Sequence, residues 1–163
     1  DKPAFASAQS VRVALVGGGY SAATSLLGLL QLAQENRSLH LSIDWLLRRR
    51  PGTAPYDRMA SDPLPSRGAL VDAANSVAEG SAPLPPNLTV TVHRGVAIDA
   101  LALDDNGAGN REQRASIAGG APRVSIKGEQ VGGSGEVENL EISCDVLVSH
   151  AGFRPEMGLT REL

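Results

Sequence analysis

The chain has 163 residues, and its 15 Lys and Arg residues against 18 Asp and Glu residues give a net charge of −3. This length suffices for one domain that buries about 70% of the surface of its unfolded chain, whereas two nucleotide-binding domains would need about twice as many residues. The mildly acidic balance and an aromatic content of 3% argue against a nucleic-acid partner held by phosphate contacts or base stacking.

The single cysteine, Cys144, excludes an internal disulfide, a redox dithiol and a multi-cysteine zinc site. The longest apolar segment, residues 22–33, is too short to cross a bilayer, and no basic-then-apolar signal segment opens the chain. We therefore expect a cytoplasmic protein without a membrane partner. Because the sequence begins at Asp1 rather than Met, we expect it to be processed or excised from a longer chain. Asn87 heads a glycosylation triplet, which we interpret as chance.

The first half of the chain alternates between strand and helix patterns. A short apolar run ends at three glycines, as a buried parallel strand does, and the segment after it carries apolar residues at helical spacing. The predicted elements are strands over 11–16, 39–47 and 88–93, a helix over 22–34, a long loop over 53–65, and a helix from an N-cap at Ser66 to Gly80. This alternation predicts a parallel sheet with right-handed crossovers.

The second half of the chain has a different pattern. Three short strands over 96–103, 123–127 and 137–143 are predicted to form an antiparallel meander, with flexible loops over 104–122 and 128–136, before a last parallel strand over 145–149. The meander would replace one crossover helix on one face of the parallel sheet. The whole chain, 1–163, is therefore predicted to be a single α/β domain with three layers.

A glycine-rich segment directly after the first strand fits the pattern G-x-G-x-x-A: Gly17, Gly18, Gly19, Tyr20, Ser21 and Ala22. In that pattern Gly17 would allow the tight turn, Gly19 would let a pyrophosphate approach the backbone, and Ala22 would let the helix pack closely against the strand. The first amides of the helix would supply partial positive charge to the phosphates. Tyr20 could cover a dinucleotide or fill the start of the helix. The alternative is an ordinary strand-to-helix turn.

Three consecutive arginines, Arg48, Arg49 and Arg50, follow the second strand. In a dinucleotide-binding fold this position lies beside the adenosine ribose, where an acidic residue binds the hydroxyls of NAD and arginine accommodates the 2′-phosphate of NADP. The first acidic residue after the run is Asp57. Residues 1–58 hold seven Lys and Arg against four Asp and Glu, whereas residues 99–145 hold four against nine. The charge distribution favours a phosphate site over the alternative, a solvated basic cluster.

Three motifs, over residues 13–22, 46–50 and 145–155, together resemble one family domain. In this order and spacing they are similar to the NADPH-binding domain of flavoproteins with two dinucleotide-binding domains, which include pyridine nucleotide-disulphide oxidoreductases, thioredoxin-reductase-like proteins and flavin-containing monooxygenases. The resemblance covers residues 11–158 and implies a Rossmann-type fold. It also implies these cofactor-binding residues: Gly17, Gly18, Gly19, Tyr20, Ser21 and Ala22 for the pyrophosphate turn; Arg48 and Arg49, with Arg50 as the weaker candidate, for the 2′-phosphate; and Ala151 and Gly152 near the nicotinamide or the flavin.

The sequence also departs from this family. It carries no second glycine fingerprint for FAD, so the resemblance implies that FAD belongs to another domain of the same parent protein, with a small-molecule or protein electron acceptor. The absence of C-x-x-C argues against the dithiol thioredoxin reductases, and Ala151 replaces the threonine of the family signature. We expect an NADPH-binding part of an FAD-dependent oxidoreductase or monooxygenase that is inactive alone. The alternative is a non-catalytic module that senses a dinucleotide or mediates assembly.

No residue stands out as catalytic, and no metal-ligand spacing is present. His93 and His150 fall at the predicted carboxyl ends of parallel strands, where a histidine could donate a proton or contact the nicotinamide. The favoured interpretation is that both are structural, hydrogen-bonded histidines. His40 lies at the opposite edge and is also expected to be structural, and Cys144 is expected to be a packed thiol.

Overall fold

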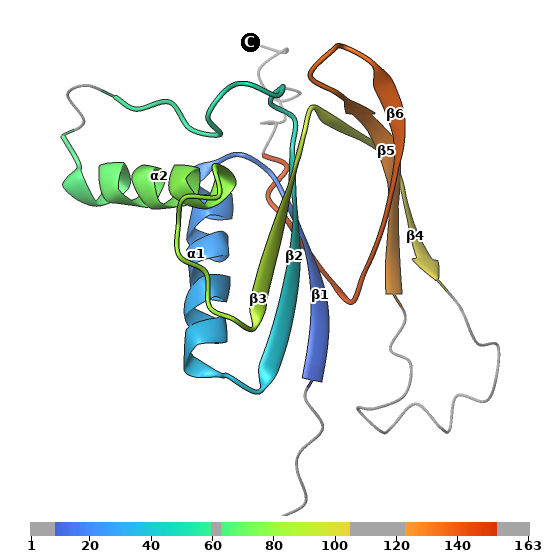
Figure 1. The fold of residues 1–163 in the computed structure, drawn as a ribbon. Coiled ribbons are helices and arrows are strands. Elements are labelled where there is room, and N and C mark those ends of the chain that lie inside the picture. The colour runs from blue at the N-terminus through green and yellow to red at the C-terminus, as the bar shows by residue number, and fades with distance from the viewer. Residues whose placement is uncertain (1–8, 60–62, 105–122, 153–163) are drawn as a thin grey trace, which may run out of the picture.

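The computed structural model describes residues 9–59, 63–104 and 123–152 (Figure 1). It is a mixed α/β structure with a four-stranded parallel sheet and a separate three-stranded antiparallel sheet. Along the chain the elements are β1 (Gln9–Val16), α1 (Tyr20–Glu35), β2 (Leu39–Leu47), α2 (Pro65–Ala78), β3 (Leu88–Arg94), β4 (Val96–Asp104), β5 (Arg123–Val131), β6 (Val137–Cys144) and β7 (Val146–Ser149).

The parallel sheet has the strand order β3-β2-β1-β7, which confirms the predicted parallel pairing. From β1, the strands β2 and β3 are added on one side. The chain then passes through the antiparallel sheet, and β7 is added on the other side of β1. The direction of strand addition therefore reverses between β1 and β7. In open parallel sheets, a crevice forms outside the carboxyl ends of the strands at such a reversal.

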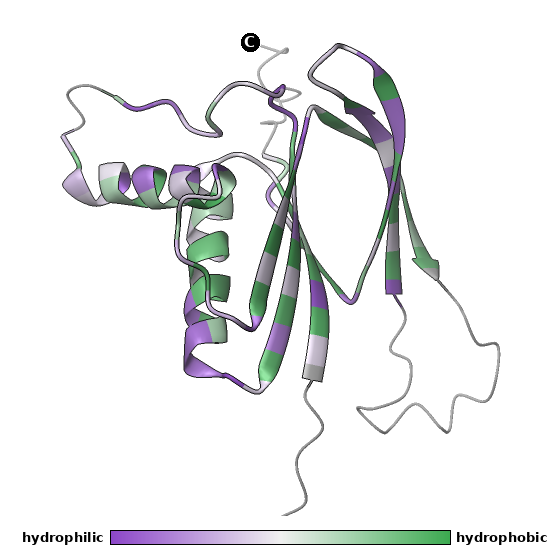
Figure 2. Cartoon of the chain, viewed as in Figure 1, coloured by the Kyte–Doolittle hydropathy of each residue, from purple (hydrophilic) through white to green (hydrophobic). Residues whose placement is uncertain are grey.

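Other elements pack against both faces of the parallel sheet. Successive side chains of a strand point to opposite faces, so each strand contributes to both layers. Val13 and Leu15 of β1 pack with the residues of α1 and α2, whereas Ala14, between them, packs with β4, β5 and β6. On β2, Trp45 faces the helices and Leu46 faces the antiparallel sheet. The result is three layers, with the antiparallel sheet in place of a helical layer (Figure 1). Figure 2 shows apolar residues alternating with polar ones along β2 and β3.

The meander was predicted with strands that are too short. Residues 128–131, predicted as part of a loop over 128–136, are the last part of β5, and a turn closed by a 2.8 Å hydrogen bond from Gly132 N to Glu136 O leads to β6. Gly128 suggested a loop, but its lack of a side chain serves packing, since a Cβ there would lie 2.1 Å from the carbonyl oxygen of Ala97. Asp104 ends β4, and residues 105–122 of the other predicted loop lie outside the described residues.

The boundaries of the other elements differ from the predictions by only a few residues. The helix α2 begins at Pro65 with Leu64 as its N-cap, rather than after an N-cap at Ser66. Proline is favoured at the first helical position because its missing N–H would have no acceptor there and its φ is already helical. Cys144 is fully buried, and burial raises the pKa of its thiol, as expected of a packed cysteine. No helix within the described part of the chain is long and apolar enough to span a membrane.

Candidate functional site

A cavity of about 720 Å³ opens at the carboxyl ends of β1, β2 and β7, where the direction of strand addition reverses. It contains the start of the glycine turn, two of the three arginines and the residues after β7. The residues that line it are Val16, Gly17, Gly18, Gly19, Leu46, Leu47, Arg48, Arg49, Pro55, Val96, Ala97, Ile98, His150, Ala151 and Gly152.

 

Val16 and Gly152, the first and last of these residues, are separated by 136 positions in the sequence. Seven of the predicted cofactor-binding residues line the cavity: Gly17, Gly18, Gly19, Arg48, Arg49, Ala151 and Gly152. Four others do not: Tyr20, Ser21, Ala22 and Arg50. The residues from β4 were not predicted. They reach the cavity because β4 begins at Val96, directly after a turn at Gly95 that ends β3.

The glycine turn passes against the end of β7. Gly17 has a φ of +125°, and a Cβ at this position would lie 2.4 Å from the carbonyl oxygen of His150. Hydrogen bonds from Gly17 N to Leu46 O (3.0 Å) and from His150 N to Val16 O (2.7 Å) fix this approach. Gly19 differs, because its φ is −94° and a Cβ there would meet nothing within 4 Å. Gly17 is therefore required by the fold, whereas Gly19 leaves open space beside the turn.

Two aromatic side chains hold the carbonyl groups of the glycine turn. Trp45 donates from Nε1 to the oxygen of Gly17 (2.9 Å), and Tyr56 donates from Oη to the oxygen of Gly19 (3.0 Å). In a trans peptide the C=O and the following N–H point in opposite directions. The N–H groups of Gly18 and Tyr20 therefore point away from these two aromatic rings. This orientation, with the first amides of α1 lacking acceptors within the helix, suits an anion at the turn.

Tyr56 supports the glycine turn, a role that the sequence did not reveal. It belongs to the loop predicted over 53–65, yet its side chain is only 6% exposed, and its backbone exchanges two hydrogen bonds with the side chain of Asn75 (3.1 and 3.0 Å). Its ring lies between those of Trp45 and Tyr20, at centroid distances of 6.2 and 6.3 Å. Tyr20 thus stacks against Tyr56 at the start of α1 but keeps 44% of its surface exposed. The only sequence signal was an aromatic residue in a proline-rich loop.

Burial raises the pKa of Tyr56 to about 12, which gives a testable pH dependence. Because the folded-state pKa lies above the unfolded value of 10.0, the Tyr56 hydroxyl loses its proton less readily in the folded protein than in the unfolded chain. Its contribution to the free energy of unfolding is therefore complete below pH 10 and is lost as the pH rises toward 12. The shift corresponds to about 2–3 kcal/mol. In urea denaturation at increasing pH, the wild type should therefore lose stability relative to Tyr56→Phe. The control is Tyr20→Phe, which keeps the hydrogen bond to Gly19. A stability difference that does not change with pH would contradict this expectation.

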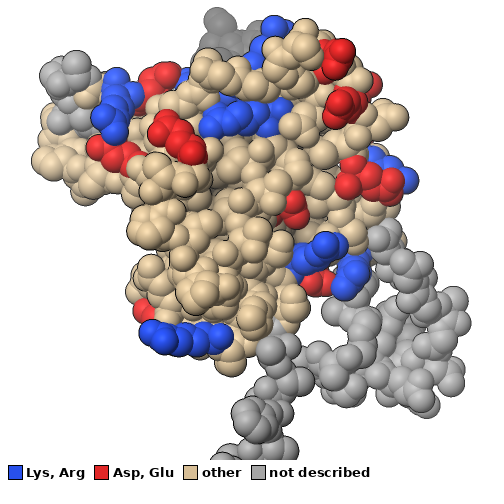
Figure 3. All heavy atoms as spheres, viewed as in Figure 1, with Lys and Arg blue, Asp and Glu red and all other residues tan. Residues whose placement is uncertain are grey.

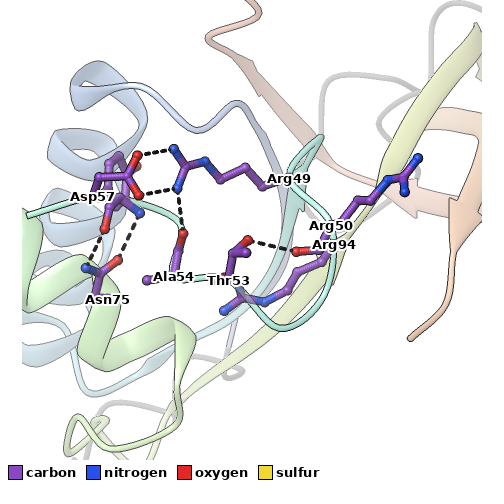
Figure 4. A network of polar contacts seen from close by, with 8 residues as sticks. Arg49, Arg50, Thr53, Ala54, Asp57, Asn75 and Arg94 are labelled. Carbon is purple, nitrogen blue, oxygen red and sulfur yellow. Dashed lines mark hydrogen bonds and ion pairs between the residues drawn. The ribbon is translucent and has the colours of Figure 1, made fainter. Parts of the chain in front are cut away.

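The three arginines do not act as one cluster. All three are exposed at the carboxyl-end edge of the parallel sheet, where Figure 3 shows basic side chains with acidic ones nearby. Arg49 forms a two-pronged ion pair with Asp57 and also donates to Ala54 O (3.0 Å), and in Figure 4 Arg50 extends in a different direction. The hydrogen bond and charge of Arg49 hold the pKa of the Asp57 carboxyl below its usual value, and Asp57 raises the pKa of Arg49.

Two of the three histidines have hydrogen-bonding partners on neighbouring elements. His150 lines the cavity, but its Nε2 is 2.9 Å from Ser25 Oγ on α1, and His93 Nε2 is 2.8 Å from Asp44 Oδ1 on β2. His40 is exposed near the start of β2, at the opposite end of the sheet. The two contacts agree with the structural interpretation of His150 and His93, whereas the expectation for His40 stays a prediction. Within residues 9–59, 63–104 and 123–152, no three His, Cys, Asp or Glu side chains gather to form a metal site.

Comparison of the sequence with known protein families and with curated proteins found no match. The chemistry of the site is therefore inferred from its own residues.

Proposed function

We propose that this domain binds NADPH in the cavity, in a Rossmann-type arrangement. The observation that carries the proposal is that one cavity, at the reversal between β1 and β7, is lined by residues from all three sequence motifs. Such a reversal is where open parallel sheets bind nucleotides. The volume of about 720 Å³ falls within the range of small-molecule sites.

The residues present fit the parts of a dinucleotide. The carbonyl oxygens of Gly17 and Gly19 are turned toward Trp45 and Tyr56, away from the amides that follow them. This arrangement and the open space beside Gly19 suit a pyrophosphate at the start of α1. The adenosine 2′-phosphate would lie at the end of β2, where Arg48 is exposed and lines the cavity. The nicotinamide half would extend toward Ala151 and Gly152, after β7. Ala22 does not line the cavity, but its complete burial allows α1 to pack closely behind the turn.

NADPH supplies a hydride, and we propose that this domain presents it to FAD held by another domain of the parent protein. In this proposal the residues of the chain position the cofactor and do not themselves react. His150 is held by Ser25, and within the described residues no side chain of the cavity is arranged as an acid–base pair with another. The electron acceptor would be a small molecule or a protein that reaches the flavin.

Calorimetric titration with NADPH and NADH tests the proposal. The chain should bind NADPH about 10- to 100-fold more tightly than NADH, because hydrogen bonds to charged groups contribute about 1.5–3 kcal/mol. The double variant Arg48→Glu/Arg49→Glu should lose this preference. Its control is Arg37→Glu, which reverses an exposed charge between α1 and β2, away from the cavity. Equal affinity of the wild type for both dinucleotides would contradict the phosphate assignment, and absence of binding would contradict the proposed function.

A further inference from the structure

Asp57 forms an ion pair with Arg49, one of the two arginines that were predicted to bind the 2′-phosphate. Arg49 directs both terminal nitrogens toward its carboxylate, with Nη1 2.9 Å from Oδ1 and Nη2 in contact with Oδ2 (Figure 4). Nη1 also donates to the carbonyl oxygen of Ala54. Arg49 lines the cavity, whereas Asp57 does not. The ion pair therefore directs the guanidinium toward a carboxylate that is not part of the cavity lining.

A 2′-phosphate would bind the same two terminal nitrogens of Arg49 that the Asp57 carboxylate contacts. Carboxylates and phosphates both accept two parallel hydrogen bonds from a guanidinium, so one fork cannot serve both fully. The Asp57 charge would also repel a phosphate dianion nearby. In the wild type, a phosphate could therefore bind Arg48 without competition from a carboxylate of the described residues. It could bind Arg49 fully only if the pair with Asp57 breaks.

We propose that Asp57 is a specificity-determining residue that limits the preference for NADPH by competing with the 2′-phosphate for Arg49. This inference rests on the proposed function. The side chains of Arg49 and Asp57 are 44% and 79% exposed, so water and salt weaken their pair and a dianion can displace it. The loop stays in place when the pair breaks, because Tyr56 remains bound to Asn75 and Gly19.

The test is calorimetric titration of Asp57→Asn with NADPH and NADH. Removal of the competing carboxylate should tighten NADPH binding about two- to fivefold, while NADH affinity stays close to that of the wild type. The matched control is Glu141→Gln, which removes one negative charge from the exposed Lys127–Glu141 pair on the antiparallel sheet. It should leave both affinities unchanged.

A double-mutant cycle separates competition from a general charge effect. In an Arg49→Gln background, Asp57→Asn should tighten NADPH binding much less than in the wild type, because the contested donor is gone and only the repulsion by the Asp57 charge is removed. Equal tightening in both backgrounds would overturn the competition for Arg49. Asp57→Ser serves as a second variant should the first fail to fold. Unchanged or weaker NADPH binding by Asp57→Asn would overturn the inference while leaving the proposed function intact. Weaker NADH binding would also overturn the inference, because it would show that Asp57 contacts the ribose rather than competing with the phosphate. A wild type that binds neither dinucleotide would overturn both proposals.

Discussion

Gly17→Ala should destabilise the folded state by about 3 kcal/mol or more, as measured by urea denaturation. Its backbone φ of +125° is strained for any residue with a side chain, and the new Cβ would lie 2.4 Å from the carbonyl oxygen of His150. This oxygen belongs to the backbone after β7, which is held by the bond from His150 N to Val16 O. Relief of the clash would therefore require separation of the ends of β1 and β7, where Val16 and His150 line the cavity.

Gly19→Ala is the matched control, since it adds the same methyl group two residues away. Its φ of −94° suits any residue, and its Cβ would meet nothing within 4 Å. The variant should lose no more than about 1 kcal/mol of stability, the cost of alanine at an N-cap. It should nevertheless bind NADPH much more weakly, because the methyl group would occupy the space assigned to the pyrophosphate. Unaltered NADPH affinity would contradict that assignment, and wild-type stability of Gly17→Ala would contradict the steric argument.

Asn87→Asp should also destabilise the protein strongly, by about 3–5 kcal/mol at neutral pH. The side chain is 6% exposed, and its Nδ2 donates to the carbonyl oxygens of Ala33 (2.9 Å), Asn36 (3.1 Å) and Leu39 (2.7 Å). One amide thus ties the end of α1 and the start of β2 to the segment before β3. An aspartate of the same shape would place a carboxylate oxygen against three acceptors. The engaged and buried amide also agrees with the interpretation of the glycosylation triplet as chance.

The expected pH dependence of this variant distinguishes charge from shape. A carboxyl group among carbonyl oxygens has a folded-state pKa above its unfolded value, so its protonation at low pH should reduce the stability loss relative to the wild type. The control Asn139→Asp makes the same change at an exposed position of β6 and should have little effect. Urea denaturation of all three proteins across a pH range measures the difference. A stability loss for Asn87→Asp within 1 kcal/mol of the control would contradict the role of this hydrogen-bond cluster.

Local sequence patterns were sufficient to predict the order of the elements. Alternating or continuous apolar runs gave the strands, with β2 predicted at its observed bounds, because the period of a strand records which face is buried. The helix start at Pro65 and the length of β5 were predicted less well. Proline and glycine were interpreted as ends of elements, whereas Gly128 lies within a strand because the backbone of β4 approaches it closely.

The sequence by itself determined the parallel α/β pattern, the glycine turn and the position of the arginine run, since each is a property of neighbouring residues. Only the tertiary structure decided which residues meet at the cavity. Tyr56 bonds to Gly19 across 37 positions, and Arg49 turns toward Asp57 rather than standing free. No periodicity encodes these contacts, because they depend on how a loop without regular structure packs across the ends of the strands. The sequence therefore located the candidate phosphate site, and the fold decided which of its arginines is already paired.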